Sequence, residues 1–255
     1  MNGAFYIGAT GLQSQERALQ VVANNIANLN TPAFKRSLVR FSELMGAPAA
    51  GALDAVSQPG GPDVGGVLAD TSARIYAQGE LRPTGNPNNI AIDGGGFIEL
   101  MGPSGQDYLW RGGVLKVNED GYLAAGNGMV LKAMISVPAG ASDLTVAADG
   151  TVRAVVDGQS SEIGKIEVAM PRDMSALSAI EGGLYLAGGS DRLTSVTPGE
   201  EGGGLFVQGS LEASNVDLSE EMIAMLLMQR AYAANAQVVQ AGDQLMSIAN
   251  GLRRG

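Results

Sequence analysis

Apolar residues recur every seven positions at both ends of this chain of 255 residues. Near the N-terminus two such lines run through Phe5, Leu12, Leu19 and Ile26, and through Val22 and Leu29. Near the C-terminus the line runs through Leu218, Met225, Tyr232, Val239 and Met246. This spacing places apolar side chains along one stripe of a helix and is typical of helices that pair in coiled coils. We therefore expect an amphipathic helix at each end, and we expect the two helices to pack on each other and on neighbouring chains.

The N-terminal helix is expected from about Gly3 to Leu29. Pro32 disfavours a helical conformation at the residue before it, so the helix is expected to stop near Asn30. Gly8 and Gln15 weaken the second apolar line, and glycine lowers helix propensity by roughly 1 kcal/mol relative to alanine.

The C-terminal helix has the better-defined start. Asp217 and Glu220 form a start that resembles a capping box, with Asp replacing Ser or Thr. A helix of about 35 residues from this point would span roughly 50 Å at 1.5 Å per residue. Gly242 is its expected weak point. A flanking line widens the apolar face, through Ala224, Ala231, Val238, Leu245 and Leu252.

Turn signals divide the region between the helices into short segments. Asp-Gly and Asn-Gly pairs recur between Asp93 and Gly158, and such pairs favour antiparallel hairpins. The expected strands include Asn89–Ile92, Phe97–Met101, Leu115–Val117, Leu144–Ala147, Val152–Val156 and Ile163–Ala169. The predicted fold class is α+β, with an antiparallel all-β central domain flanked by long N- and C-terminal helices that pair as a coiled coil.

Four segments follow from these patterns. Residues 1–45 form the N-terminal helix and arm, 46–66 a linker rich in Gly, Pro and Ala, 67–207 the β-rich central domain, and 208–255 the C-terminal helix. The stretch from Phe34 to Met45 carries the basic residues Lys35, Arg36 and Arg40. It fits a short helix or an extended arm.

Composition excludes several kinds of chemistry. The chain has no Cys and no His, which removes disulfides, the commonest general base and the commonest transition-metal ligand. A formal net charge of -10 argues against nucleic-acid binding through a positive field. No apolar stretch approaches the roughly 18 residues of a membrane span, and the first basic residue is Arg17, so no cleavable signal peptide is expected. We expect no cofactor, no bound metal, no nucleic acid and no membrane insertion.

No enzyme motif stands out, so the chain is expected not to be an enzyme. The triplets Gly94-Gly95-Gly96 and Gly202-Gly203-Gly204 lack the Lys-Ser/Thr of a phosphate loop and are expected to be turns. Asn118-Glu119-Asp120-Gly121 lacks the Asp spacing of a calcium loop and is expected to be a hairpin. A Ser–Lys dyad is not excluded, although no spacing indicates one.

The asparagines at the end of the first helix are unusual, since Asn is a middling-to-poor helix former. They are Asn24, Asn25, Asn28 and Asn30. Two explanations stay open. They form a solvated face near the helix end, or they make amide hydrogen bonds between chains that fix the register of an assembly.

Several motifs in order resemble those of bacterial flagellar rod and hook proteins, and the similarity spans nearly the whole chain. Near the N-terminus the motifs are Gly11-Leu12, Ala23-Asn24-Asn25-Ile26-Ala27-Asn28 and Thr31-Pro32-Ala33-Phe34-Lys35-Arg36. Towards the β domain they are Gln78-Gly79-Glu80-Leu81, Thr84-Gly85-Asn86, Asn89–Phe97 and Asp149-Gly150-Thr151-Val152. The tail contributes Gly209–Asp217 and Gln229-Arg230-Ala231-Tyr232. Length and layout resemble the basal-body rod proteins of the proximal (F) and distal (G) types.

The resemblance implies a structural subunit of the flagellar basal-body rod. Such a subunit would leave through the flagellar type III export apparatus without signal cleavage. It would assemble with copies of itself, with neighbouring rod proteins and with hook or ring components. The product would be a hollow helical shaft that spans the periplasm and transmits motor torque to the hook. The terminal helices would form its inner layer, and the β domain would lie outside.

The expected assembly interface combines the helical stripes with the asparagines. Its residues are Phe5, Leu12, Leu19, Val22, Asn24, Asn25, Ile26, Asn28, Leu29, Leu218, Met222, Met225, Tyr232, Val239 and Met246. One position departs from the resemblance. Ala33 stands where the family usually has Gly, so a tight turn that depends on Gly is in question there.

Two other functions remain in view. A secreted adhesive or carbohydrate-binding β domain with helical assembly tails would need an exposed aromatic platform, for which Tyr108, Trp110 and Tyr122 are the candidates. A Ser–Lys hydrolase would need a serine beside a neutral lysine.

Overall fold

The computed structural model describes residues 2–44, 66–103, 105–180, 182–186, 193–200 and 202–252. The linker expected over 46–66 lies outside the described residues, apart from Gly66. Contacts divide the chain into two compact units. The helical unit comprises Met1–Ala27, Ser37–Ile75 and Asp217–Gly255, and the β unit comprises Asn28–Arg36 and Tyr76–Val216. The expected segments divide the chain differently, because residues 66–75 group with the helices and 28–36 with the β strands. The segment expected as the C-terminal helix over 208–255 was also too long, because residues 208–216 belong to the β unit and α2 begins at Leu218.

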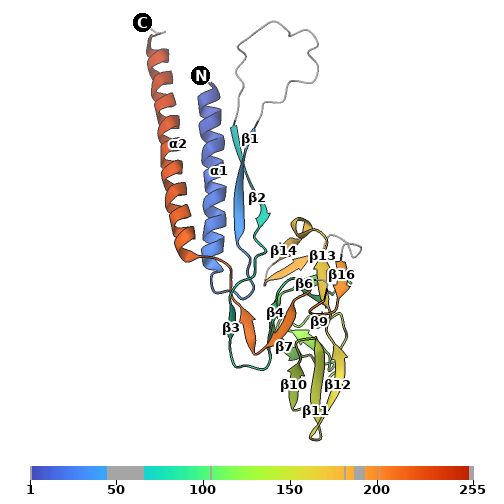
Figure 1. Cartoon of the computed structure of the whole chain (residues 1–255). Coiled ribbons are helices and arrows are strands. Elements are labelled where there is room, and N and C mark those ends of the chain that lie inside the picture. Colours follow the sequence, from blue (N-terminus) through green and yellow to red (C-terminus); the bar gives the residue numbers. More distant parts are fainter. Residues whose placement is uncertain are drawn as a thin grey trace, which may run out of the picture. The chain divides into compact units, whose positions relative to one another are not determined.

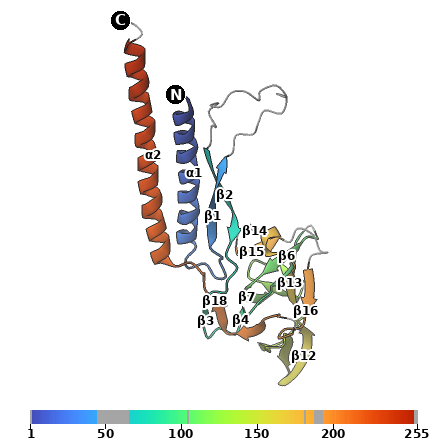
Figure 2. The same cartoon turned by 45° about the horizontal axis from the view of Figure 1, so that its top comes forward.

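The helical unit contains two helices and one strand pair (Figure 1). Helix α1 spans Asn2–Ala27 and helix α2 spans Leu218–Leu252. Strands β1 (Ser37–Leu44) and β2 (Gly66–Arg74) form an antiparallel two-stranded sheet. Figures 1 and 2 both place α1 between α2 and this sheet, and α1 contacts both. The helical unit is thus three layers, with α1 in the middle.

Helix α1 ends at Ala27, two residues before the expected last helical residue, Leu29. The chain then turns, as the Thr31 amide donates to the Asn28 carbonyl oxygen at 3.1 Å and the Thr31 hydroxyl bonds to Asn28 Oδ1 at 3.1 Å. Asn and Thr side chains stabilise such turns at the expense of a further helical turn. Asn28 and Leu29 therefore lie beyond the helix, and Leu29 does not extend its second apolar line.

The stretch from Phe34 to Met45 is extended as far as the structure describes it. Residues Ser37–Leu44 form β1, so the short-helix alternative is wrong and the extended arm is confirmed. The pairing partner of β1 begins at Gly66, and the register includes an irregularity between Leu38 and Arg40. The local sequence pattern did not distinguish a short helix from an extended arm, because β1 is stabilised by pairing with β2, a distant segment of the chain.

Helix α2 begins where the sequence indicated. The Asp217 carboxylate accepts from the amides of Ser219 and Glu220 at 2.7 and 3.1 Å. This satisfies two of the amides that a helix start leaves without helical partners. Two acidic residues, Glu220 and Glu221, occupy the first turn, where they suit the helix dipole.

The β unit is built on one long sheet in which all neighbouring strands are antiparallel. In spatial order its strands are β14 (Ser178–Ile180), β15 (Leu184–Leu186), β6 (Asp107–Trp110), β5 (Ile98–Met101), β9 (Val130–Leu131), β8 (Leu123–Ala125), β7 (Gly112–Val117), β4 (Asn89–Asp93) and β17 (Leu205–Gln208). The expected antiparallel β domain is confirmed.

Smaller sheets and one short helix complete the β unit. They are β10 (Asp143–Val146), β11 (Thr151–Val156) and β12 (Gln159–Lys165) as one sheet, β13 (Val168–Pro171) with β16 (Leu193–Val196), β18 (Ser210–Glu212) with β3 (Leu81–Pro83), and the 3-10 helix η1 (Met174–Ala176). The strand expected over Ile163–Ala169 is wrong as a single element, because β12 ends at Lys165 and β13 joins another sheet.

Turn chemistry explains why the hairpins form. Asp157 and Gly158 connect β11 to β12 in two residues, with φ angles of 51° and 79°. Two central residues at positive φ are what a type I′ hairpin turn requires. The core beneath these hairpins is mostly aliphatic. Its buried members include Ile90, Ile92, Ile98, Leu100, Leu115, Leu123, Leu131, Val152, Ile166, Val168 and Phe206.

Candidate assembly surfaces and the buried ion cluster

Helices α1 and α2 pack against each other and run antiparallel. A Cβ built on Gly8 would lie 2.5 Å from Val239 Cγ2, and one on Gly11 would lie 2.8 Å from Asn235 Nδ2. A Cβ on Gly242 would lie 3.4 Å from Phe5 Cζ. As residue numbers in α1 rise from 5 to 11, the numbers of the contacting residues in α2 fall from 242 to 235. The two helices are therefore antiparallel. The glycines that we expected to weaken the helices, Gly8 and Gly242, lie where the two helices are in close contact.

The α1 residues of the expected interface are partly covered within the chain itself. Val22 is buried, and Phe5, Leu12, Leu19 and Ile26 are half-buried. Helix α1 also contacts β2, where the Ser14 hydroxyl donates to the Val67 carbonyl oxygen at 2.6 Å. Much of the apolar surface of α1 is therefore covered by α2 and β2 of the same chain.

The second helix presents two different faces. Met225, Val239 and Met246 are half-buried, whereas Leu218, Met222 and Tyr232 are exposed. On the covered side Glu221 is buried, and the partly covered positions include Met225, Met228, Asn235, Val239, Gly242 and Met246. The flanking line at Val238, Leu245 and Leu252 lies in solvent instead of widening the packed face.

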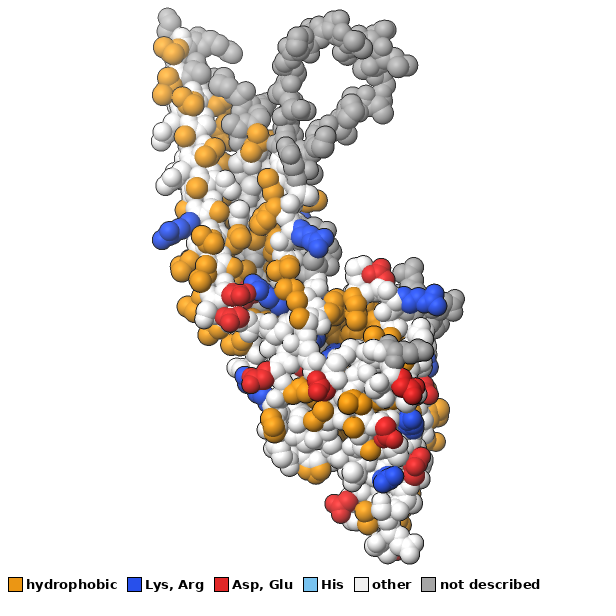
Figure 3. Space-filling model, viewed as in Figure 1, with side chains coloured by type: hydrophobic (Ala, Val, Ile, Leu, Met, Phe, Trp, Pro, Cys, Tyr) orange, Lys and Arg blue, Asp and Glu red, His pale blue; other side chains and the backbone are white. Residues whose placement is uncertain are grey.

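We call the exposed apolar residues of α2 its outer face. Leu226 and Leu245 are 58% and 63% exposed, values far above those of the protein core. Figure 3 shows hydrophobic side chains at intervals along the visible surface of this helix. Many large apolar side chains exposed along one helix indicate an interaction surface. The outer face comprises Leu218, Met222, Ile223, Leu226, Leu227, Tyr232, Val238, Leu245, Ile248 and Leu252.

Asn25 satisfies its hydrogen bonds within the chain. It is 1% exposed, and its amide nitrogen donates to the Ser37 carbonyl oxygen at 2.9 Å and to Glu221 Oε1 at 3.2 Å. Its amide oxygen accepts from the Ser37 backbone nitrogen at 3.0 Å. Asn25 therefore joins α1, β1 and α2, which neither the solvated-face nor the interchain explanation foresaw. This contact could not be predicted from the sequence, because Glu221 lies 196 residues from Asn25.

The remaining asparagines differ from Asn25. Asn24 is exposed and lines a cleft of about 470 Å³ with Arg17 and Arg74. Asn28 is half-buried in the turn after α1, and Asn30 is exposed.

A buried ion cluster lies in the β unit. Lys35 and Glu212 side chains are each 1% exposed and form an ion pair. Arg111 donates from Nε to Glu212 Oε2 at 3.0 Å, and from its terminal nitrogens to the carbonyl oxygens of Gly94 and Gly96. Burial lowers the pKa of Lys35, and the neighbouring Glu212 opposes that shift. The sequence showed Lys35 as one member of a basic cluster and gave no sign of its partner 177 residues away.

The two glycine triplets lie against each other. The Gly204 amide donates to the Gly95 carbonyl oxygen at 2.8 Å, and a Cβ on Gly94 would lie 2.8 Å from Gly204 Cα. Side chains would prevent this approach, and the carbonyl groups of the first triplet are used to bind Arg111. Close backbone packing, in addition to turn geometry, accounts for glycine here.

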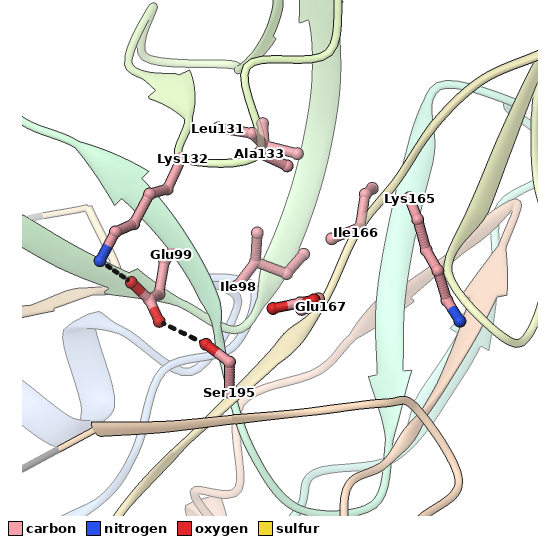
Figure 4. Close-up of a pocket in the computed structure, with 9 residues that line it drawn as sticks. All are labelled: Ile98, Glu99, Leu131, Lys132, Ala133, Lys165, Ile166, Glu167 and Ser195. Carbon is pink, nitrogen blue, oxygen red and sulfur yellow. Dashed lines mark hydrogen bonds and ion pairs between the residues drawn. The ribbon is translucent and has the colours of Figure 1, made fainter.

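A pocket in the β unit tests the hydrolase alternative (Figure 4). It has a volume of about 300 Å³ and includes Lys132, Glu99 and Ser195. Lys132 Nζ lies 2.5 Å from Glu99 Oε2 and 3.0 Å from Asp107 Oδ2, and the Ser195 hydroxyl bonds to Glu99 Oε1 at 3.4 Å. The hydrogen bond to Glu99 raises the pKa of Lys132, so the amine is protonated and unsuited to act as a general base. This geometry disfavours a Ser–Lys dyad at this pocket.

The proposed aromatic platform is not present as an exposed group. Trp110 is 6% exposed and packs in the core, while Tyr108 and Tyr122 are half-buried. Within the described residues, no cluster of three or more carboxylate, His or Cys side chains could hold a metal ion. None of the described helices combines the length and apolar character needed to cross a membrane.

Comparisons with known proteins identify relatives that match nearly the whole chain. The FlgG flagellar basal-body rod protein of Buchnera aphidicola subsp. Baizongia pistaciae is 35% identical, over 95% of this chain and 96% of its own length. The corresponding protein of Caulobacter vibrioides is 34% identical over 98% of this chain and 99% of its own. The chain belongs to the flagellar basal-body rod family. A FlgF rod protein of Caulobacter vibrioides is also similar, at 30% identity over 96% of this chain and 95% of its own.

Three family descriptions match different parts of this rod-family chain. Residues 5–35 match the flagella basal body rod protein family, and 91–154 match the D1 domain of the flagellar hook protein FlgE/F/G family. Residues 207–252 match the C-terminal part of the flagellar basal body rod FlgEFG proteins. The terminal matches include most of α1, all of α2, and the ion-paired residues Lys35 and Glu212.

In this rod-family chain Ala33 adopts the backbone conformation that Gly takes most readily. Its φ is 56°, and its amide donates to the Glu212 carbonyl oxygen at 2.8 Å. Left-handed backbone at a residue with a Cβ costs roughly 1–2 kcal/mol. The turn in question is therefore retained without glycine, at the cost of local strain.

Proposed function

We propose that this chain is a structural subunit of the bacterial flagellar basal-body rod. It self-assembles into a hollow helical shaft that transmits torque from the motor to the hook. The outer face of α2 carries this proposal, since water-exposed Leu, Ile and Met side chains along a long helix gain free energy when a neighbouring copy covers them. Contacts between unlike surfaces of successive copies then generate an open helix instead of a closed ring.

Within each copy, α1 and α2 pair as an antiparallel coiled coil. Close contacts at Gly8, Gly11 and Gly242 support this pairing. The covered positions of α2 also support it, because they alternate in steps of four and three residues, as the contact positions of a coiled coil do. These positions are Glu221, Met225 and Met228, and then Asn235, Val239 and Gly242. The expected interface then divides between two roles. Half-buried members such as Leu19 and Met225 hold the pair together, and exposed members such as Met222 and Tyr232 contact neighbouring copies.

The partners proposed for the chain follow from rod assembly. They are copies of itself, neighbouring rod proteins, hook or ring components, and the flagellar export apparatus. A net charge of -10 supports the absence of nucleic acid among them. The protonated Lys132 and the names of the relatives support a structural and not an enzymatic role.

The chain reaches the periplasm-spanning rod through the type III apparatus without cleavage of a signal peptide. This route is supported by the N-terminal sequence, in which the first basic residue is Arg17, because a cleavable signal peptide begins with a positively charged region. Mass spectrometry of protein recovered from basal bodies tests it. A peptide that includes Phe5 and Tyr6 is expected, and consistent removal of the region before Arg17 would contradict it.

A charge on the outer face of α2 tests the assembly proposal. Leu226→Asp places a carboxylate at the expected contact between copies, where burial of an unpaired charge is strongly unfavourable. Motility and recovery of hook–basal bodies should be lost, while circular dichroism of the purified chain stays unchanged. Gln159→Asp, which adds the same charge at an exposed position of strand β12 in the β unit, is the control and should assemble. Normal rods from the Leu226 variant would contradict the proposal.

A further inference from the structure

The chain passes between the helical unit and the β unit four times, after Ala27, Arg36, Ile75 and Val216. Three segments of the β unit lead to these passages. They are residues 28–36, residues 76–80 and residues 212–216. Force that travels along the backbone from the helices enters the β unit through these segments, because they hold the points where the chain passes between the two units.

The three segments converge on Glu212. Its carboxylate forms the ion pair with Lys35, and it accepts from the Gly79 amide at 2.9 Å. Lys35 Nζ also donates to the Ala77 carbonyl oxygen at 2.8 Å. One carboxylate and one ammonium group thus join residues from all three segments.

Main-chain contacts surround this centre. The Ala33 amide donates to the Glu212 carbonyl oxygen at 2.8 Å, and the Asn215 amide donates to the Phe34 carbonyl oxygen at 3.3 Å. Asn215 Oδ1 accepts from the Arg36 backbone nitrogen at 2.7 Å. The segment that continues α1 and the segment that precedes α2 therefore lie side by side within the β unit.

Arg111 fixes the cluster to the rest of the β unit. It bonds to Glu212 Oε2 and to the backbone of the first glycine triplet, which adjoins strand β4. Charge-assisted hydrogen bonds between buried groups are the stronger kind, since no water competes for them. Glu212 is thus tied to the connecting segments on one side and to the large sheet on the other.

We propose that the Lys35–Glu212–Arg111 cluster is a mechanical clamp through which force on the two terminal helices enters the β unit. This inference rests on the proposed function, because a shaft that transmits torque loads these connections. In this clamp, Lys35 holds the segment 28–36, which follows α1, against Glu212. Its removal leaves the Glu212–Arg111 pair intact inside the β unit, so it weakens the connection without leaving a buried carboxylate unpaired.

Single-molecule pulling of the full chain tests the clamp. The chain has no native Cys, so handles attach uniquely through Gln13→Cys in α1 and Gln237→Cys in α2, both at exposed positions. Force first separates the two helices and then acts between residues 28–36 and 212–216. The wild-type cluster should give a distinct second rupture, and Lys35→Met should abolish it or move it to clearly lower force.

Lys132→Met is the matched control, since it removes a lysine from the half-exposed cluster with Glu99 and Asp107 in the same unit. Its rupture force should equal that of the wild-type chain. Trp110 fluorescence during urea unfolding checks that both variants retain a folded β unit. If Lys35→Met is not folded, Lys35→Arg keeps the positive charge and should retain the second rupture.

An unchanged second rupture in folded Lys35→Met would overturn the clamp, as would an equal loss in the Lys132 variant or loss of the rupture in folded Lys35→Arg. These outcomes leave the proposed rod function standing. That function fails separately if the wild-type chain is absent from purified basal bodies. The pulling experiment needs no rod, so the two failures are distinguishable.

Discussion

Single residues in this chain are constrained by backbone geometry and by burial. Ala33 occupies left-handed backbone next to the ion cluster, and Asn25 is buried among three elements of the helical unit. Both features depend on atoms that belong to distant parts of the sequence. Their substitution should therefore have effects that local helix or turn propensity does not predict.

Substitutions at Ala33 should separate backbone strain from packing. Ala33→Gly relieves the strain of positive φ but removes a buried methyl, so the free energy of unfolding should change by less than about 1 kcal/mol. Ala33→Val places a β-branched side chain at positive φ and should cost about 2 kcal/mol or more. Urea unfolding followed by Trp110 fluorescence measures both. Equal stability of the two variants would show that φ at this position is unimportant.

Asn25 offers a test of buried hydrogen bonding. Asn25→Ala leaves the Ser37 amide and the buried Glu221 carboxylate without this partner, which should lower helical-unit stability by about 1–3 kcal/mol. Asn24→Ala, at the adjacent exposed position, should cost much less. Thermal unfolding followed by circular dichroism at a helix-sensitive wavelength compares them. A smaller loss at residue 25 than at residue 24 would contradict the assigned contacts.

At the level of elements, the two helices depend on close approach at glycines. Gly8→Ala improves helix propensity by about 1 kcal/mol, yet the new methyl would lie 2.5 Å from Val239 Cγ2. Overpacking of this kind typically costs about 1–3 kcal/mol, so a net loss of stability is expected. The same thermal unfolding measurement applies.

Shortening Val239 tests whether that loss comes from the helix contact. The double variant Gly8→Ala with Val239→Ala should regain much of the stability lost in Gly8→Ala, because the clashing methyl groups are removed. Purely additive losses in the two single variants and the double variant would show that residues 8 and 239 do not interact.

Sequence patterns predicted the helices better than the arm between them. Seven-residue spacing indicated α1 and α2 and their mutual packing, and Asx-Gly turns indicated the hairpins. The sequence did not predict the β1–β2 pair, because more than twenty residues separate its strands and the Gly- and Pro-rich stretch between them was interpreted as a linker. The apolar stripe also suggested one packed face on α2, whereas contact with α1 divides that helix into an inner and an outer face.

The candidate sites show the same limit. Individual residues of the motifs could be named from the sequence, including Lys35, Asn25 and Met222. Their partners could not, since Glu212 and Glu221 lie 177 and 196 residues from Lys35 and Asn25. Glycine at positions 8 and 242 was interpreted through helix propensity, whereas its role depends on contact with a second helix, which only the fold reveals.

For the whole molecule, membership of the flagellar rod family and the exposed outer face of α2 support the same proposal. A three-layer helical unit covers α1 on two sides and leaves apolar α2 residues in water. A monomer gains nothing from that exposure, whereas an assembly of copies buries it. The β unit already has its own continuous core, so assembly through the helices need not disturb it.

Protection of the outer face inside the rod is the measurement that tests this account most directly. Leu226→Cys introduces the sole thiol of the chain, and Glu119→Cys in an exposed hairpin is the control. In the free chain a maleimide reagent should label both variants. In purified hook–basal bodies it should label the residue 119 variant and leave the residue 226 variant protected. Equal labelling of both variants in intact basal bodies, or absence of the chain from them, would contradict the account.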